Sequence, residues 1–170
     1  RLEYEIPARG LIGFRSEFMS ITSGTGILTH VFDHYGPLGQ QNIGQRRNGV
    51  MISQEDGHAV AYALFNLQER GALFVGHNDR VYEGMIIGIH NRDNDLTVNP
   101  LKAKELTNVR AAGSDENVVL TPPMRLDLEQ ALEFINDDEL VEVTPKAVRL
   151  RKRWLKEHER KKASRQKATA

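Results

Sequence analysis

The first 35 residues alternate between patterns typical of a strand and of a helix. In residues 1–6, RLEYEI, every second side chain is apolar, which predicts a half-buried strand. Residues 11–21 carry apolar side chains at helical spacing, and Gly24 stands where a left-handed residue would end that helix. Residues 27–35, ILTHVFDHY, return to β-branched and aromatic side chains. This part of the chain therefore predicts strand, helix, strand.

The pattern changes after residue 35. Residues 36–49 contain four glycines, one proline and almost no periodicity, so we expect a junction between domains. Residues 50–65, VMISQEDGHAVAYALF, predict a hairpin around an Asp-Gly turn. Residues 66–75 predict a short helix and then a strand, and residues 80–90 predict another strand.

The segment from residue 90 to residue 125 has three prolines and no sustained period, and such a long irregular stretch is usually functional or disordered. A helix is expected next, because Asp127 and Gln130 form a capping-box pattern before an apolar stripe. Residues 140–145 and 147–153 predict a final pair of strands. The remainder, 154–170, is interpreted as a basic helix or a disordered tail.

The sequence has no net charge, but its charges are divided strongly along the chain. Residues 144–170 hold eleven basic and two acidic side chains, whereas the first 143 residues hold twelve basic and twenty-one acidic ones. A basic tail on an acidic body indicates a polyanionic partner, most simply nucleic acid. A solvated tail that only keeps the protein in solution is the alternative.

Composition places the chain among soluble globular proteins, with 39% hydrophobic and 27% charged residues. Its apolar runs are too short to cross a bilayer. The absence of cysteine excludes disulfides and thiolate metal sites and agrees with the reducing cytoplasm. We therefore expect a cytoplasmic protein with no membrane partner.

Residues 22–26, TSGTG, raise the question of a phosphate-binding loop. A P-loop requires a strand before it, a helix after it and a Gly-Lys-Ser/Thr end. Here the predicted helix precedes the glycines, so its partly negative end points towards them, and no lysine follows. The glycines are therefore interpreted as a helix stop before a strand.

No catalytic constellation is visible. The closest histidine sets, His30 with Asp33 and His34, and Asp56 with His58, match no standard metal-ligand spacing. No serine lies in a Gly-x-Ser-x-Gly elbow, and a thiol nucleophile is impossible without cysteine. We expect no catalytic residue, metal site or bound cofactor in this chain.

Nucleic-acid binding is better supported. The last predicted strand places Arg149, Arg151 and Arg153 on one face beside Trp154, which provides charge for phosphate and a ring for stacking. The irregular segment adds cations and asparagines that can donate to phosphate and 2′-hydroxyl oxygens, although its mixed charge could equally serve a protein partner. The candidate RNA-binding residues are Arg46, Arg47, Arg92, Asn94, Lys102, Lys104, Asn108, Arg110, Arg149, Arg151, Lys152 and Arg153.

Longer motifs point to a family. The run RGLIGFRSEFMSITSGTGILTHVFDHY is similar to the second half of domain V of translational GTPases of the elongation factor G class. The runs GQRRNGVMIS, VYEGMIIGIHNRDNDLTVNPLKAKELTNVRAAGSDE and PPMRLDLEQALEFINDDELVEVTPKAVRLRKR resemble the C-terminal region of the BipA/TypA family. The resemblance covers nearly the whole chain and fades after Arg153.

This resemblance implies an α+β fold in several parts. Residues 1–35 would be the second half of domain V, which is half of a ferredoxin-like domain with the order strand, helix, strand. Residues 36–49 would be the junction. Residues 50–153 would be the C-terminal domain, mostly β with one clear helix and a long irregular loop, followed by a basic tail over 154–170.

The family consists of bacterial ribosome-associated GTPases, so the resemblance implies contacts with large-subunit rRNA and A-site tRNA, and roles in large-subunit assembly and in translation under stress. GTP and Mg²⁺ would bind a G domain that has no counterpart in this sequence, so we expect no GTP hydrolysis by this chain alone. Half a ferredoxin-like domain leaves strand edges uncovered. We expect it to be completed by the rest of its own GTPase chain or by self-association, or else to be mobile. The alternative function is a protein-interaction or oligomerisation module with a solvated tail.

Overall fold

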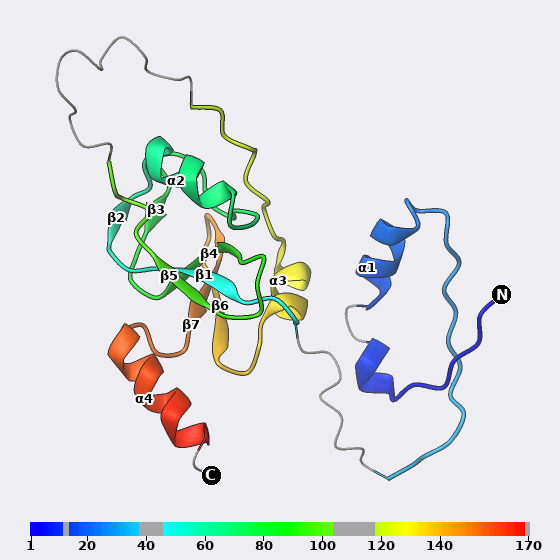
Figure 1. Ribbon diagram of the computed structural model, residues 1–170. Helices are drawn as coiled ribbons and strands as arrows, with labels where there is room; N and C mark the ends of the chain where they lie inside the picture. Colours follow the sequence, from blue (N-terminus) through cyan, green and yellow to red (C-terminus); the bar gives the residue numbers. More distant parts are fainter. Residues whose placement is uncertain (12–13, 38–45, 104–117, 169–170) are drawn as a thin grey trace. The chain divides into compact units, whose positions relative to one another are not determined.

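The chain folds as two units, shown in Figure 1. The computed structural model describes residues 1–11, 14–37, 46–103 and 118–168. Unit 1 comprises Arg1–Arg46 and unit 2 comprises Arg47–Ala170, so the division falls within the segment expected to be a junction. Helices and strands are mixed along the chain, which confirms the α+β class.

Unit 1 contains the 3₁₀ helix η1 (Ala8–Leu11) and the helix α1 (Phe14–Ile21). The predicted helix is therefore confirmed from Phe14 onwards. The Gly24 amide donates to the Met19 carbonyl at 2.8 Å, and the φ angle of Gly24 is +78°. Glycine adopts this left-handed conformation without a steric penalty, so it ends the helix as the sequence predicted.

The strands predicted on either side of α1 are not formed. Residues 1–7 and 25–37 have no regular secondary structure, and no β-ladder includes either segment among the described residues. A strand requires the hydrogen bonds of a neighbour, which alternating side chains cannot supply by themselves. The apolar side chains consequently remain in solvent: Tyr4 is 83% exposed and Val31 is 91% exposed.

Unit 2 is built on a five-stranded sheet with the order β5-β1-β4-β7-β6. Its strands are β1 (Val50–Ser53), β4 (Met85–Ile89), β5 (Leu96–Val98), β6 (Glu139–Val143) and β7 (Val148–Lys152). A smaller ladder joins β2 (Gly57–His58) to β3 (Arg80–Val81), and the helices are α2 (Ala61–Gln68), α3 (Leu128–Phe134) and α4 (Glu157–Ala168). β1 runs parallel to β5, and the other neighbours in the large sheet are antiparallel.

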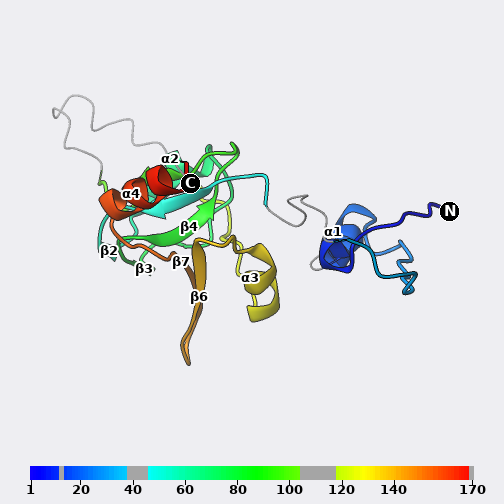
Figure 2. The same ribbon diagram turned by 90° about the horizontal axis from the view of Figure 1, so that it is seen from below.

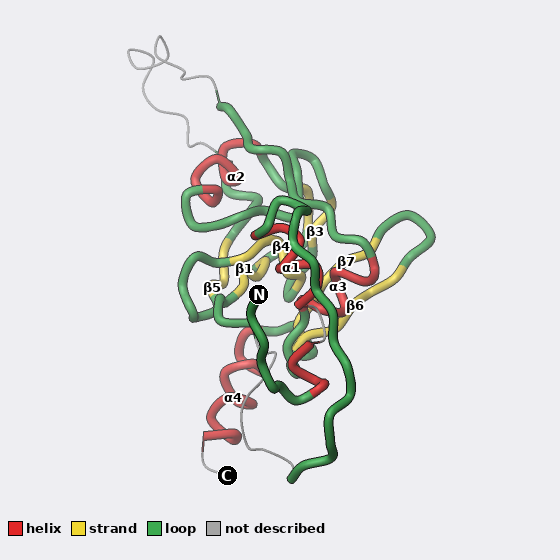
Figure 3. Tube along the Cα trace, turned by 90° about the vertical axis from the view of Figure 1, so that its right-hand side faces the viewer, coloured by secondary structure: helices red, strands yellow, loops and turns green. Residues whose placement is uncertain are grey.

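The large sheet has a hydrophobic core on each face. Met51 and Ile87 belong to the core that includes α2, whereas Ile52 and Ile86 belong to the core that includes Ala131 of α3. Neighbouring residues of a strand point to opposite faces, so α2 and α3 cover opposite sides of the sheet (Figure 2). Each of these buried aliphatic side chains contributes about 1.5–3 kcal/mol to folding. The β6–β7 hairpin extends beyond the rest of the sheet (Figure 3).

Several predicted elements of unit 2 are confirmed. The segment 50–53 is β1, and the last two predicted strands form the antiparallel pair β6 and β7. The capping box of α3 is complete: the Gln130 amide donates to Asp127 Oδ1 at 2.8 Å, and the Asp127 amide donates to Gln130 Oε1 at 3.2 Å. Local chemistry therefore located the start of this helix.

Other predictions for unit 2 are wrong. The second arm of the predicted hairpin forms α2, because its alanine and leucine residues favour a buried helix over a strand. The strand predicted after Gly71 is reduced to one bridge, between Leu73 and Gly88. The strand predicted over 80–90 is divided into β3 and β4 by a turn at Gly84, whose φ angle is +85°. β5 was missed, because three residues are too few to show a period.

None of the helices in the described part of the chain combines the length and apolarity that a bilayer crossing requires.

Candidate RNA interface

Lys152, a predicted RNA-binding residue, has a buried ammonium at the end of β7. Its Nζ lies 2.6 Å from Asp95 Oδ2, 2.9 Å from Asp138 Oδ2 and 2.9 Å from Glu139 Oε1. Three carboxylates match the three donors of the ammonium. Lys152 shares a strand face with Leu150, which is part of the core. Lys152, although predicted to bind RNA, is therefore not available to RNA, because its ammonium is enclosed by carboxylates and does not face solvent.

The charge of Lys152 is stabilised by its surroundings. Burial lowers the pKa of Lys152, but the hydrogen bond to Asp95 and the negative charges of Glu139 and Asp138 outweigh burial, and the pKa is raised above its ordinary value. Glu139 is itself buried, and its second oxygen accepts a hydrogen bond from the Asn136 amide at 3.1 Å. The cluster therefore holds an ionised lysine at neutral pH.

Asp95 connects this cluster to the loop that carries two predicted residues. Its Oδ1 accepts a hydrogen bond from the Val50 amide at 2.9 Å, while its Oδ2 binds Lys152. Arg92 and Asn94 precede Asp95 and have exposed side chains. The ion pair thus brings the Arg92 and Asn94 loop close to the end of β7.

Arg153 follows Lys152 and is exposed. Its guanidinium lies 5.9 Å from the centroid of the Trp154 ring, within cation–π distance. Its amide donates to the Asp138 carbonyl at 2.8 Å, which holds the backbone beside the lysine cluster. The cation and the aromatic ring that the sequence placed together are therefore in contact with each other.

Arg160 attaches α4 to the same end of unit 2. Its Nη1 donates to the carbonyl of Trp154 at 3.3 Å and to the carbonyl of Leu155. Burial lowers the pKa of Arg160, while carboxylates, Glu157 first among them, act in the opposite direction. Its Nη2 is buried and has no hydrogen-bond partner among the described residues.

A stripe of basic side chains follows the exposed side of α4. Its members are His158, Lys161, Lys162 and Arg165, which recur at i, i+3, i+4 and i+7 and are all exposed. This spacing places them on one helix face, and together they line a shallow surface hollow. Lys161 also pairs with Glu157 at 2.6 Å. We call these four residues the α4 basic stripe; such a row of cations suits a nucleic-acid backbone.

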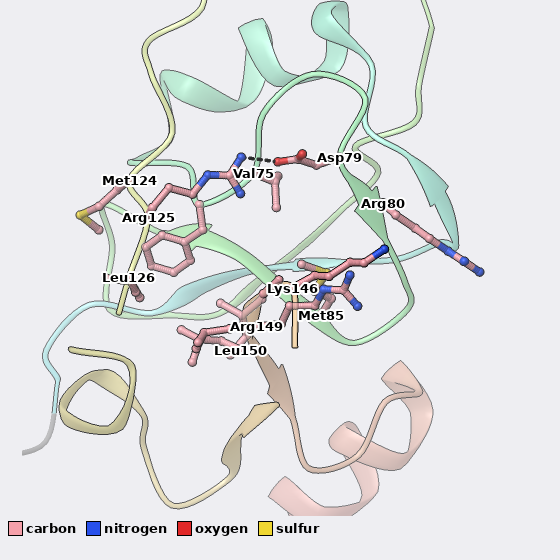
Figure 4. Close-up of a pocket in the computed structure, with 14 residues that line it drawn as sticks. Val75, Asp79, Arg80, Met85, Met124, Arg125, Leu126, Lys146, Arg149 and Leu150 are labelled. Atoms are coloured by element: carbon pink, nitrogen blue, oxygen red, sulfur yellow. Dashed lines mark hydrogen bonds and ion pairs between the residues drawn. The ribbon is translucent and has the colours of Figure 1, made fainter. Parts of the chain in front are cut away.

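A second group of cations surrounds a pocket beside the β6–β7 hairpin (Figure 4). This hairpin pocket has a volume of about 360 Å³. Its apolar side chains include Phe74, Met85, Ile86, Met124 and Leu150, and its cations are Arg80, Arg125, Lys146 and Arg149. Arg149 is the predicted RNA-binding residue that lines it.

Of the four cations that line the hairpin pocket, one is in an ion pair with a described residue. The Arg125 Nη2 donates to Asp79 Oδ2 at 2.9 Å, and the same oxygen accepts from the Gly76 amide at 2.7 Å. Figure 4 shows the guanidinium of Arg125 directed at Asp79. By contrast, Arg80, Lys146 and Arg149 make no ion pair with any of the residues that the structure describes. The pocket therefore carries an excess of positive charge.

Arg151 is half-buried on the face of β7 opposite to Leu150. The same face carries Glu142, which accepts a 2.6 Å hydrogen bond from the Tyr82 hydroxyl. Burial and this hydrogen bond raise the pKa of Tyr82 above its ordinary range, and the charge of Arg151 acts against them. The positive charge of Arg151 therefore acts on the hydrogen-bonded pair of Tyr82 and Glu142.

The remaining predicted residues belong neither to the α4 basic stripe nor to the hairpin pocket. Arg46 ends unit 1 and is half-buried, while Arg47 begins unit 2 and is exposed, as is Lys102. The other three candidates, Lys104, Asn108 and Arg110, lie outside the described residues.

In unit 1, His34 lies between two carboxylates. Its Nδ1 is 2.8 Å from Asp33 Oδ2, and its Nε2 is 3.7 Å from Glu5 Oε1. All three side chains are exposed. One ligand atom from each of the three residues lies within 4.8 Å of the others, and exposed acidic groups are commonly arranged in this way without an ion.

Sequence reasoning missed three of the pocket cations. Arg80, Arg125 and Lys146 belong to separate segments that only the folded chain brings together. The α4 basic stripe had a visible signal, because its helical spacing can be read from the sequence once the tail is assigned as a helix.

Comparisons with known proteins agree with this division of the chain. The model of the elongation factor G C-terminus matches residues 1–46, and the model of the TypA/BipA C-terminal domain matches residues 48–157. The first match coincides with unit 1, and the second lies within unit 2.

Relatives with high identity carry one common name. The chain is 64% identical over 169 residues to the large ribosomal subunit assembly factor BipA of Buchnera aphidicola subsp. Schizaphis graminum, covering 99% of this chain and 28% of that protein. It is 64% identical over 165 residues to the protein of the same name from Escherichia coli K12, with 97% and 27% covered. The corresponding protein of Salmonella typhimurium LT2 is 63% identical over 165 residues, with the same coverage. The chain thus spans just over a quarter of the length of these relatives. Since the TypA/BipA model matches more than half of the chain, the chain belongs to the TypA/BipA family.

Proposed function

We propose that this chain is an RNA-binding part of a factor that assembles the large ribosomal subunit, and that it contacts rRNA and A-site tRNA in the cytoplasm. The relatives named as large ribosomal subunit assembly factors support the ribosomal partner. The observation that carries the RNA contact is the α4 basic stripe, which presents four cationic or titratable side chains on one exposed helix face. Arg153, Arg92 and Asn94 are further exposed candidates, on segments that the Lys152 cluster holds together just before α4.

The physical basis of this contact is the release of counterions from phosphate. Each neutralised phosphate contributes about 0.7 to 0.9 to the slope of log affinity against log salt concentration. The stripe supplies two lysines on adjacent positions of one face, and their ammonium groups act as point charges without reading the base. The expected binding is therefore strong at low salt and independent of sequence.

The test is a salt titration of binding to purified large ribosomal subunits. The double variant Lys161→Ala/Lys162→Ala should bind more weakly and lose roughly 1.5 from the salt slope. Arg70→Ala, which removes an exposed cation at the end of α2, is the matched control and should retain the wild-type slope. Wild-type affinity and slope in the double variant would rule out the stripe as an RNA contact.

We further propose that this chain alone does not hydrolyse GTP. Its sequence has neither a Gly-x-x-x-x-Gly-Lys-Ser/Thr loop nor an Asn-Lys-x-Asp motif, and the family resemblance assigns GTP and Mg²⁺ to a separate G domain. Release of phosphate from GTP by the purified chain, at a rate above that of buffer, would overturn this expectation.

A second candidate function is protein association through unit 1. The observation that favours it is the exposure of alternating apolar side chains, Tyr4 and Val31 among them, on segments that have no strand partner in the described part of the chain. Further residues of a longer family member or a second copy of this chain would cover them. Solution mass measured over a range of concentrations separates these cases, because only self-association makes the mass rise with concentration.

A further inference from the structure

The hairpin pocket combines two properties that the α4 basic stripe does not. Its floor is apolar, because Ile86 and Leu150 are partners across β4 and β7 and are only 1% and 3% exposed; Met124, which is 39% exposed, also lines the pocket. Its rim carries Lys146 and Arg149, which make no ion pair among the described residues; Glu142 lies opposite Arg149 in the β6–β7 ladder. The pocket is therefore both hydrophobic inside and positively charged at its edge.

This combination restricts the chemistry of a ligand. Unpaired cations attract an anion, but an inorganic anion alone would leave the apolar floor in contact with water. A ligand that joins a flat, mostly apolar ring to a phosphate would cover the floor and satisfy the rim together. We propose that the hairpin pocket binds one unpaired nucleotide of RNA, with its base against the Ile86, Met124 and Leu150 surface and its phosphate at Lys146 and Arg149. This proposal rests on the proposed function, namely that the chain binds RNA.

The size of the pocket favours a single nucleotide over a paired helix. At about 360 Å³ the volume lies at the lower end of the range for small-molecule sites, and a duplex cannot enter it. Proteins that recognise RNA beyond its shape use unstacked bases, which they hold on apolar, aromatic or guanidinium surfaces. An acidic peptide would satisfy the cations without supplying a flat ring for the floor.

The two basic surfaces would then have different roles. The α4 basic stripe has charge without an apolar pocket, so it contributes affinity for any RNA backbone. The hairpin pocket distinguishes unpaired from paired RNA. A variant of either surface should therefore change a different property of binding.

The experiment compares two fluorescent RNA duplexes of equal length, one fully paired and one with a single unpaired uridine. Anisotropy titrations with the 170-residue chain should show about tenfold tighter binding of the RNA with the unpaired uridine. The variant Lys146→Ala/Arg149→Ala should remove this preference and weaken binding of the paired RNA by at most about threefold. Met124→Ala, which changes no charge, should also reduce the preference.

Two variants act as controls. The stripe variant Lys161→Ala/Lys162→Ala should weaken binding of both RNAs equally and keep the preference. Arg149→Lys keeps the positive charge but loses the planar guanidinium. It therefore separates the attraction of the phosphate, which needs only the charge, from contact of the guanidinium with the base. An unchanged thermal midpoint of Met124→Ala shows that loss of preference does not arise from unfolding.

The outcomes are distinct. Equal binding of the two RNAs by the wild-type chain would overturn the nucleotide site and leave the proposed function intact. No binding of either RNA would overturn both. Displacement of the RNA with the unpaired uridine by a polyglutamate peptide, but not by free oligouridine, would reassign the pocket to an acidic protein and overturn the proposal.

Discussion

The Asp95 carboxylate lies 2.6 Å from the Lys152 ammonium and joins the loop before β5 to the last residue of β7. These two strands are not neighbours, because β1 and β4 separate them in the sheet. The other oxygen of Asp95 accepts from the amide of Val50, the first residue of β1. One side chain therefore holds together the ends of three strands.

The first prediction concerns the loss of this ammonium. Lys152→Ala should lower the free energy of unfolding by about 3–5 kcal/mol, because it leaves the buried Glu139 carboxylate without its counter-charge. Denaturant unfolding of the variant and the wild type measures the difference. Lys156→Ala removes an exposed lysine nearby and should change the stability by less than about 0.5 kcal/mol. A cost for Lys152→Ala as small as that of the control would show that the cluster does not stabilise the fold.

The second prediction concerns alkaline pH. Folding raises the pKa values of Tyr82 and Lys152 above the ordinary values of about 10 and 10.5, so the folded state keeps protons that the unfolded chain releases. The resulting stabilisation is complete below pH 10 and disappears as the pH rises through the folded-state pKa values. We expect the free energy of unfolding, measured by denaturant between pH 7 and pH 11, to decline above about pH 10.

Tyr82→Phe makes this prediction specific. The variant should lose about 1–2 kcal/mol at neutral pH, because Glu142 loses its 2.6 Å hydrogen bond, and its alkaline decline should be shallower than that of the wild type. Tyr62→Phe, at a more exposed tyrosine of α2, is the control and should keep the wild-type decline. Parallel curves for Tyr82→Phe and the wild type would exclude Tyr82 as a cause.

The third prediction concerns the attachment of α4. Gly84 has a φ angle of +85°, and a Cβ at this position would lie 2.6 Å from the Cα of Leu155. Gly84→Ala should therefore cost about 2 kcal/mol or more and displace the segment before α4, which trypsin would then cleave faster. Gly76→Ala is the control, because its Cβ would meet no heavy atom closer than 3.5 Å. Equal cleavage rates for the two variants would contradict this account.

The fourth prediction tests the capping box of α3. Asp127→Ala removes the oxygen that accepts from the Gln130 amide at 2.8 Å, and it should cost about 1 kcal/mol in a thermal or denaturant measurement. Asp137→Ala changes an exposed carboxylate beyond the end of the helix and should have little effect. Rescue by Asp127→Asn, whose side-chain oxygen can also accept, would show that the cap rather than the charge matters.

Local chemistry made parts of this fold predictable. Gly24 and Asp127 mark a helix end and a helix start through bonds to residues only a few positions away, so their roles follow from the sequence. The β6–β7 pair was predictable for the same reason, because its strands are adjacent in the chain. The two strands expected in unit 1 were not, because a ladder depends on a partner that the pattern does not identify.

The candidate site was less predictable than the fold. Lys152 lies among the alternating arginines of β7, and the carboxylates of Asp95, Asp138 and Glu139, which the fold brings to it, explain why its charge lies inside. Arg80 and Arg125 line the same pocket as Lys146 and Arg149 only when the chain has folded, because they come from segments far from the β6–β7 hairpin in the sequence. Charge counting therefore identified the basic end of the chain, but it could not separate a structural cation from those that remain available to a ligand.

The order of the strands has a consequence for biosynthesis. β4 can pair with β1 soon after both have been translated, but its second edge stays open until residues 148–152 emerge and β7 is inserted between β4 and β6. During that interval the apolar face around Ile86 lacks part of its cover, and an unpaired edge of this kind is a site for chaperone capture or aggregation. The nascent protein leaves this vulnerable stage when Lys152 reaches its three carboxylates, so the insertion of β7 completes both this sheet and its electrostatic anchor.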